Sequence, residues 1–230
     1  QDPKLTLYEH VGPVRILKGE NDDWTAFPDQ ALLETARQSA YAFRLAPTDT
    51  TSAALVLELS PGLYSARTES ASGVPGVSLV EVYLPGDGSG PPRRLANLSC
   101  RARVSGGDGI LIPGITVTGT EFATLLVRAV GPGLGQWIEP SSLLADPEIR
   151  LMAGSTAIAT NNDWQEGPDY PLVHAAARSV HAFGLPDNSL DAAMLVRVPP
   201  GSYTIHLSGR GVNNTGIALV EVYHVNHPTP

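Results

Sequence analysis

The stretch GVSLVEVY at residues 76–83 returns as GIALVEVY at residues 216–223, with six of the eight residues identical. In an extended conformation this segment is apolar on both faces, and Glu81 and Glu221 are its only charged residues. A short apolar run of this kind predicts a strand that is covered on both sides. Because the same strand occurs twice, the sequence predicts two related β units.

The repeat extends well beyond this strand. Residues 21–45 and 161–185 are identical at 11 of 25 positions and begin with NDDW and NNDW. Asp2-Pro3 likewise returns as Asp146-Pro147, and the Pro-Gly-x-Tyr sequence at 61–64 returns at 200–203. The offset between the copies drifts by a few residues, as loops of unequal length would cause. Duplication is therefore the strongest signal in the chain.

The two copies are unequal in what surrounds them. The first copy runs from about residue 2 to 84, and the second from about 146 to 224. Between them lie a Gly/Pro-rich linker at 85–94 and a block at 95–145 that has no counterpart upstream. We therefore expect a first unit at 1–84 that corresponds to the C-terminal half of a module, and a complete second module at 95–230. On this interpretation the chain begins inside a module.

Most segments have the spacing of strands. Alternating apolar residues predict strands at 5–8 and 149–152, and short apolar runs that end at Pro-Gly turns predict hairpins at 53–69 and 192–207. Alanines and apolar residues at helical spacing predict one short helix in each copy, within 30–43 and 170–183. Three more strands are expected at 99–104, 110–118 and 124–130. The predicted fold class is all-β, with two jelly-roll-like β-sandwich units that each carry one short helix.

Composition excludes several classes of protein. The 230 residues carry a net charge of −8 with only two lysines, which argues against nucleic-acid binding. No apolar run is long enough to span a bilayer, so no membrane insertion is expected. The single cysteine, Cys100, cannot build a disulfide framework. Few lysines with many Gly and Pro residues fit an extracellular β protein.

An ordered set of motifs resembles a tandem β-sandwich repeat module of large secreted bacterial proteins of the Verrucomicrobia and Planctomycetes type. The C-terminal half is also similar, more weakly, to the bacterial pre-peptidase C-terminal domain. The resemblance implies an extracellular, non-catalytic β-sandwich, and it carries over no catalytic residue. Cys100 departs from the small hydroxyl residue that is usual at its position. The motifs are LANLSCR at 95–101, LIPG at 111–114, LLVRAVGP at 125–132, ADP at 145–147, NNDW at 161–164 and LVEVY at 219–223.

The NDDW element is the best metal candidate in the sequence. Asp22, Asp23 and Asp163 each follow a strand, and Ca²⁺ prefers clustered carboxylate and carbonyl oxygens. The alternative is a turn that ends the strand and holds Trp24 and Trp164 in the core. The spacing lacks the Asp-x-Asp-x-Asp-Gly signature of a calcium loop. Calcium is the one cofactor that the sequence suggests.

The remaining candidates concern ligand binding and catalysis. Trp137 has no counterpart in the repeat, so it is the best candidate for a surface contact with a sugar, whereas Trp24 and Trp164 are expected to pack near Phe43 and Phe183. Glu81 and Glu221 lack a second carboxylate at a specified spacing and are expected to accept hydrogen bonds from backbone or Arg groups at a sheet edge. No catalytic motif occurs, so no enzymatic activity is expected.

The sequence favours a non-catalytic structural or assembly module of an extracellular or cell-surface bacterial protein. Its expected partners are further copies or neighbouring modules, because the first unit lacks the strands that 95–145 supply to the second. An unpaired sheet edge recruits strands from elsewhere, and head-to-tail completion propagates into filaments. Two alternatives stay open. The first copy closes as a small sandwich by itself, or the chain is an accessory module that binds polysaccharide or a cell surface.

Overall fold

A computed structural model describes residues 2–74, 76–84, 95–212 and 214–225. The chain divides into a first unit, Gln1–Arg94, and a second unit, Leu95–Pro230. The predicted Gly/Pro linker at 85–94 lies outside the described residues. The described residues are mostly β, with several antiparallel sheets and two α-helices, which confirms the predicted all-β class.

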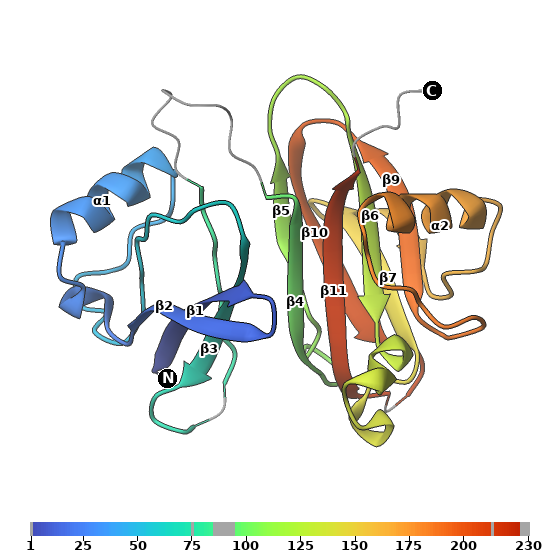
Figure 1. The fold of residues 1–230 in the computed structure, drawn as a ribbon, viewed down its shortest axis with the longest axis horizontal. Helices are drawn as coiled ribbons and strands as arrows, with labels where there is room; N and C mark the ends of the chain where they lie inside the picture. The colour runs from blue at the N-terminus through green and yellow to red at the C-terminus, as the bar shows by residue number, and fades with distance from the viewer. Residues whose placement is uncertain (1, 75, 85–94, 213, 226–230) are drawn as a thin grey trace. The chain divides into compact units, whose positions relative to one another are not determined.

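The second unit is a sandwich of two four-stranded antiparallel sheets with the orders β5-β10-β7-β8 and β4-β11-β6-β9 (Figure 1). The strand expected at 110–118 is shorter than predicted, because it spans only Gly114–Val117, and Leu111 forms an isolated bridge with Leu207. In chain order the elements are β4 (Asn97–Val104), β5 (Gly114–Val117), β6 (Ala123–Val130), η2 (Pro132–Gln136), η3 (Pro140–Ser142), β7 (Pro147–Ala153), β8 (Thr156–Asn161), α2 (Tyr170–Ser179), β9 (Ala192–Val198), β10 (Gly201–Gly209) and β11 (Gly216–Val225).

Strand β6 is apolar on both faces because both faces are covered. Leu125, Val127 and Ala129 point into the main core between the two sheets. Leu126 points the other way, into a second cluster formed with α2, which lies beside β6 and β9 in Figure 1. The order of layers in the second unit is therefore sheet, sheet, helix.

The first unit holds one three-stranded antiparallel sheet with the order β2-β1-β3. Its helix ends before Tyr41, which has a left-handed φ of 54°, and α2 ends before His181 with a φ of 57°. The shared conformation shows that both helices end with the same turn. In chain order the elements are β1 (Pro3–Val11), β2 (Val14–Asn21), η1 (Trp24–Ala26), α1 (Gln30–Ser39) and β3 (Leu63–Ser70).

The sheet of the first unit repeats the pairing of β8, β7 and β10. Leu5 faces Asn21 and Thr68 on its two neighbouring strands, and Ile149 faces Asn161 and Leu207 in the same way. A register shift follows Leu7 in β1 and Leu151 in β7. The β1–β2 hairpin is longer than β7–β8, which explains the drifting offset between the copies.

Two segments of the first unit differ from the expectation. Residues 53–59 and 76–83 were predicted as strands, and their counterparts β9 and β11 are strands, yet neither segment joins a sheet (Figure 1). In the second unit, β6 lies between β11 and β9 and pairs with both. Residues 2–74 and 76–84 contain no counterpart of β6. The two segments therefore lack the strand that would join them.

The core of the described structure lies in the second unit. Every buried hydrophobic side chain belongs to residues 104–225, whereas Thr6 is the only buried residue among 2–74 and 76–84. Val220 is 1% exposed, and its counterpart Val80 is 46% exposed. The first unit thus has the sheet and helix of the repeat without its core.

The two repeated tryptophans differ in burial. Trp164 is 5% exposed and packs edge-on against Tyr170, with 5.4 Å between ring centroids. Trp24 is half-buried, and its Nε1 donates to Asp49 O at 2.6 Å. The expected packing of Trp164 near Phe183 is wrong, because the Phe183 ring packs against Trp137. Phe43 is exposed rather than covering Trp24.

Trp164→Ala is expected to lower the free energy of unfolding of the second unit by about 3–5 kcal/mol, because it leaves a cavity between α2 and β6. Denaturant titration of the full chain, followed by circular dichroism, measures the loss. Trp137→Ala serves as the control and should cost no more than about 1 kcal/mol, since surface substitutions cost little. Equal losses for the two variants would contradict the assignment of Trp164 to the core.

Candidate functional site

A buried ion pair crosses the sheet β4-β11-β6-β9. Arg128 on β6 lies opposite Glu221 on β11, and its Nε is 3.2 Å from Glu221 Oε2. Both side chains are almost fully buried. Since a buried charge is costly without a partner, each of these residues requires the other. Glu221 was expected at a sheet edge, but β11 lies between β4 and β6.

Neighbouring groups also contact the ion pair, although Arg128 Nη2 is buried without a hydrogen-bond partner. Arg128 Nη1 donates to Phe183 O at 2.8 Å, and the guanidinium lies 4.4 Å from the centroid of the Phe183 ring. The Tyr223 hydroxyl donates to Glu221 Oε1 at 2.7 Å. Desolvation and this hydrogen bond raise the pKa of the Tyr223 hydroxyl. The pair therefore joins β6 and β11 to the segment that follows α2.

A second buried carboxylate fixes the end of β6. Asp191, which precedes β9, is fully buried and accepts hydrogen bonds from Gly131 N at 2.8 Å and Gly133 N at 3.0 Å. A side chain at Gly133 would place its Cβ 2.9 Å from Asp191 Oδ2, so glycine is required there. The ion pair and this contact hold β6 to both of its neighbours, β11 and β9.

The first unit contains the neighbours of β6 without the strand itself. We use the term open seam for residues 53–59 and 76–84, the counterparts of β9 and β11. The start of 53–59 is placed as in β9, because Ala54 N donates to Asn21 Oδ1 at 2.9 Å and Ala193 N donates to Asn161 Oδ1 at 2.8 Å. Leu57 also packs on β2, since a Cβ added at Gly19 would lie 3.3 Å from Leu57 Cδ1.

The acidic half of the ion pair is present in the open seam. Glu81 is the counterpart of Glu221, and desolvation and a hydrogen bond with Glu81 raise the pKa of Tyr83 as Glu221 does for Tyr223. Among the described residues, no cation is paired with Glu81. Phe43, the counterpart of the phenylalanine under Arg128, is 57% exposed. The first unit therefore contains sequence counterparts of the carboxylate and the ring that contact Arg128, without an arginine.

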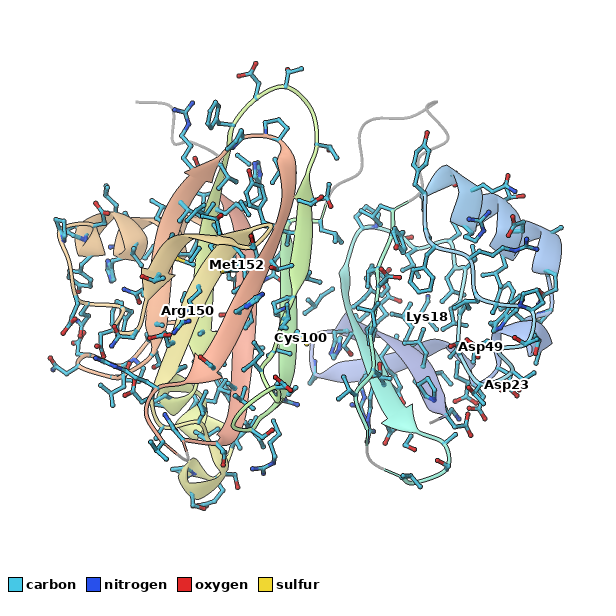
Figure 2. The ribbon with its side chains drawn as sticks, turned by 180° about the vertical axis from the view of Figure 1, so that it is seen from behind. Lys18, Asp23, Asp49, Cys100, Arg150 and Met152 are labelled. Carbon is cyan, nitrogen blue, oxygen red and sulfur yellow. The ribbon has the colours of Figure 1, made fainter. Side chains whose placement is uncertain are left out.

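The proposed calcium ligands lie at the end of β2 and β8. Figure 2 shows Asp23 and Asp49 at the same edge of the first unit, and Asp22 is exposed. Asp163 lies with its Oδ2 3.8 Å from Arg210 Nη1. In the part of the chain that the structure describes, no group of three or more His, Cys, Asp or Glu residues could hold a metal ion. Calcium binding by Asp22, Asp23 and Asp163 stays a prediction.

The asparagines that open these elements make local contacts. Asn21 Nδ2 donates to Asp23 O at 2.9 Å, and Asn161 Nδ2 donates to Asp163 O at 3.1 Å. With the contacts to Ala54 and Ala193, each asparagine connects a sheet to the segment that follows its helix. The asparagine that begins NDDW and NNDW therefore has the same structural role in both copies.

Trp137 follows η2 and is 59% exposed. Its ring packs edge-on against the Phe183 ring, with 5.1 Å between ring centroids. One side of the indole therefore packs on Phe183 while the rest faces solvent. This position is compatible with a surface contact, and sugar binding by Trp137 stays a prediction.

The two residues that anchor β6 were not predicted from the sequence. Arg128 occurred only within the motif LLVRAVGP, and Asp191 was not singled out. A signal for Arg128 was available, because an arginine inside an otherwise apolar strand requires a carboxylate, and Glu221 is the one charged residue of the repeated strand. Asp191 had no such signal, since aspartate before a strand is common in turns.

No protein-family model matches the chain, and no curated protein matches it. Among solved structures, the chain is similar to the pre-peptidase C-terminal domain of a collagenase from Bacillus anthracis, with 12% sequence identity and a TM-score of 0.33. The similarity covers 55% of this chain and 88% of that domain. The pre-peptidase C-terminal domain is the weaker of the two resemblances noted in the sequence.

Arg128→Met is expected to lower the free energy of unfolding of the second unit by about 3–5 kcal/mol, because it leaves Glu221 buried without a cation. The double variant Arg128→Met/Glu221→Leu should cost less than Arg128→Met alone, since it removes both charges. Denaturant titrations of the wild type, the two single variants and the double variant test this. Additive losses in the double variant would contradict the assignment of these residues as a pair.

The second unit is expected to lose stability above about pH 10, the ordinary pKa of tyrosine. The Tyr223 pKa is raised in the folded state, so the unfolded chain releases this proton first, and stability falls as the pH rises further. Denaturant titrations at pH 8 and 11 should show a smaller alkaline loss for Tyr223→Phe than for wild type. Cys100→Ala is titrated in parallel to measure the separate contribution of that thiol, whose pKa desolvation also raises. An unchanged loss in Tyr223→Phe would contradict this prediction.

Proposed function

We propose that this chain is a non-catalytic structural module of an extracellular or surface-exposed bacterial protein, and that it assembles with other polypeptides through its first unit. The observation that carries the proposal is the unequal burial in the two units. The second unit has a complete core, and the described part of the first has no buried hydrophobic side chain. A domain of about this size needs a core or a partner to be stable.

The charged groups of the second unit support a structural role. Arg128, Glu221 and Asp191 are the buried charged residues, and each contacts an element of the same sandwich. Their contacts hold β6, β9 and β11 together. A catalytic carboxylate would instead face a cleft where a substrate can reach it.

The exposed side chains of the first unit support assembly. Val77, Leu79 and Val82 are 94%, 74% and 52% exposed, and they lie in the segment whose counterpart is a buried strand. Contiguous exposed apolar groups mark surfaces that bind other proteins.

No helix among the described residues is long and apolar enough to cross a membrane.

A second candidate function is the binding of polysaccharide, which the exposed ring of Trp137 favours. Exposed tryptophans provide a flat apolar face with a polar edge, which suits sugar rings. A glycan array with the full chain tests this, and Trp137→Ala is the matched control. Binding that survives in the variant would rule out Trp137 as the contact.

Hydrogen exchange combined with light scattering tests the assembly function. Where the chain is a monomer, amides at 53–59 and 76–84 should exchange rapidly while those of β6, β9 and β11 are protected. Association should slow exchange in 53–59 and 76–84, because unpaired backbone groups become bonded. A stable monomer at micromolar concentration with residues 2–84 already protected would contradict the proposed function.

A further inference from the structure

We propose that the open seam binds an extended polypeptide segment that carries an arginine opposite Glu81, in the place that β6 takes in the second unit. This inference rests on the assembly function proposed above and names the chemistry of the partner.

The position of the guest strand follows from the repeat. Arg128 of β6 faces Glu221 on one side and Ala193 on the other. Because β6 lies between them in the second unit, β9 and β11 stand about 9.5 Å apart, which is twice the spacing of neighbouring strands. Glu81 and Ala54 are the counterparts of these two neighbours. A guest strand antiparallel to both segments would therefore pair with both.

One face of the guest is set by the charge of Glu81. In the second unit this face holds Arg128 against a carboxylate, a phenylalanine ring and a backbone carbonyl. Glu81 and Phe43 are the counterparts of this carboxylate and this ring in the first unit. Arginine is favoured over lysine, because a planar guanidinium can contact a carboxylate, a carbonyl and a ring at once.

The other face of the guest is set by apolar side chains. Val220 and Val222 are buried against the opposite sheet, whereas Val80 and Val82 are 46% and 52% exposed. A guest with small apolar residues on this face would cover them, as Leu125, Val127 and Ala129 do in β6. The paired segment of the guest is thus mainly apolar, and the arginine is its one charged residue.

The two units differ at the residue that precedes β9 in the second unit and 53–59 in the first. Trp24 N donates to Ser52 O at 2.7 Å, and Trp164 N donates to Asp191 O at 2.8 Å, so Ser52 takes the place of Asp191. The first unit therefore lacks the carboxylate that binds Gly131 and Gly133. Recognition of the guest depends on Glu81 and on strand pairing, and it requires no glycine turn after the strand.

The β6 strand of a second folded copy is a poor guest. It lies between β11 and β9, and its Arg128 is already paired with Glu221. Its release would expose the main core of the second unit. The guest is therefore a segment of another polypeptide, with the β6 pattern and without a sandwich of its own.

A synthetic peptide with the sequence of residues 120–136 tests the proposal on the full chain. The peptide carries its own arginine at the position of Arg128. Hydrogen exchange should show new protection at 53–59 and 76–84 when the peptide is added. Titration should show about tenfold weaker binding when this arginine is replaced by methionine, at the lower end of the coupling of close charge pairs.

The variant Glu81→Gln provides the matched control in the protein. It should weaken binding of the arginine peptide about as much as the methionine replacement does, and the two changes together should cost little more than one. Equal binding of both peptides to wild type would overturn the arginine assignment. Protection that rises with chain concentration and ignores Glu81→Gln would assign the seam to a second copy, which overturns this inference and leaves the assembly function intact. Full protection of the seam in a monomer would overturn both.

Discussion

The pairing of Arg128 with Glu221 across β6 and β11 is the interaction on which the second unit depends. β6 joins two strands that come from the repeated part of the chain, and its arginine can be buried only beside that carboxylate. The rest of the sandwich follows from this placement. One face of β6 builds the core between the sheets, and the other face gives α2 a surface to cover. The same carboxylate recurs in the first unit, where the described residues offer no such strand.

The second unit contains β6 and a buried core, and the described part of the first unit contains neither. This difference shows how much apolar burial depends on one strand. Burial of apolar surface stabilises a fold by about 25 cal/mol per Å², and the first unit gains little of it because its apolar groups remain exposed. A guest that binds only the folded form would stabilise it by mass action, by about 2.7 kcal/mol at one hundred times its dissociation constant. The stability of the first unit is then a property of the assembly.

Much of this architecture could be predicted from the sequence, because the repeat and its local patterns are strong. The helices at Gln30–Ser39 and Tyr170–Ser179 lie within the predicted ranges. The segments at 53–59 and 76–83 were predicted as strands because their spacing matches β9 and β11, but a strand also needs a neighbour, and local pattern carries no information about one. The partner of Phe183 was missed for a similar reason, since Trp137 has no counterpart in the repeat.

The charge in the middle of the open seam also has a consequence for solubility. Exposed apolar strands are templates for aggregation, and natural proteins limit this by placing charged side chains among them. Glu81 and Glu58 place acidic groups in both halves of the seam. A neutral or acidic strand that paired there would have to bury an unmatched carboxylate, which is costly. Glu81, which attracts a strand that carries a cation, therefore disfavours pairing with strands that carry none. It also disfavours pairing between the open seams of two copies.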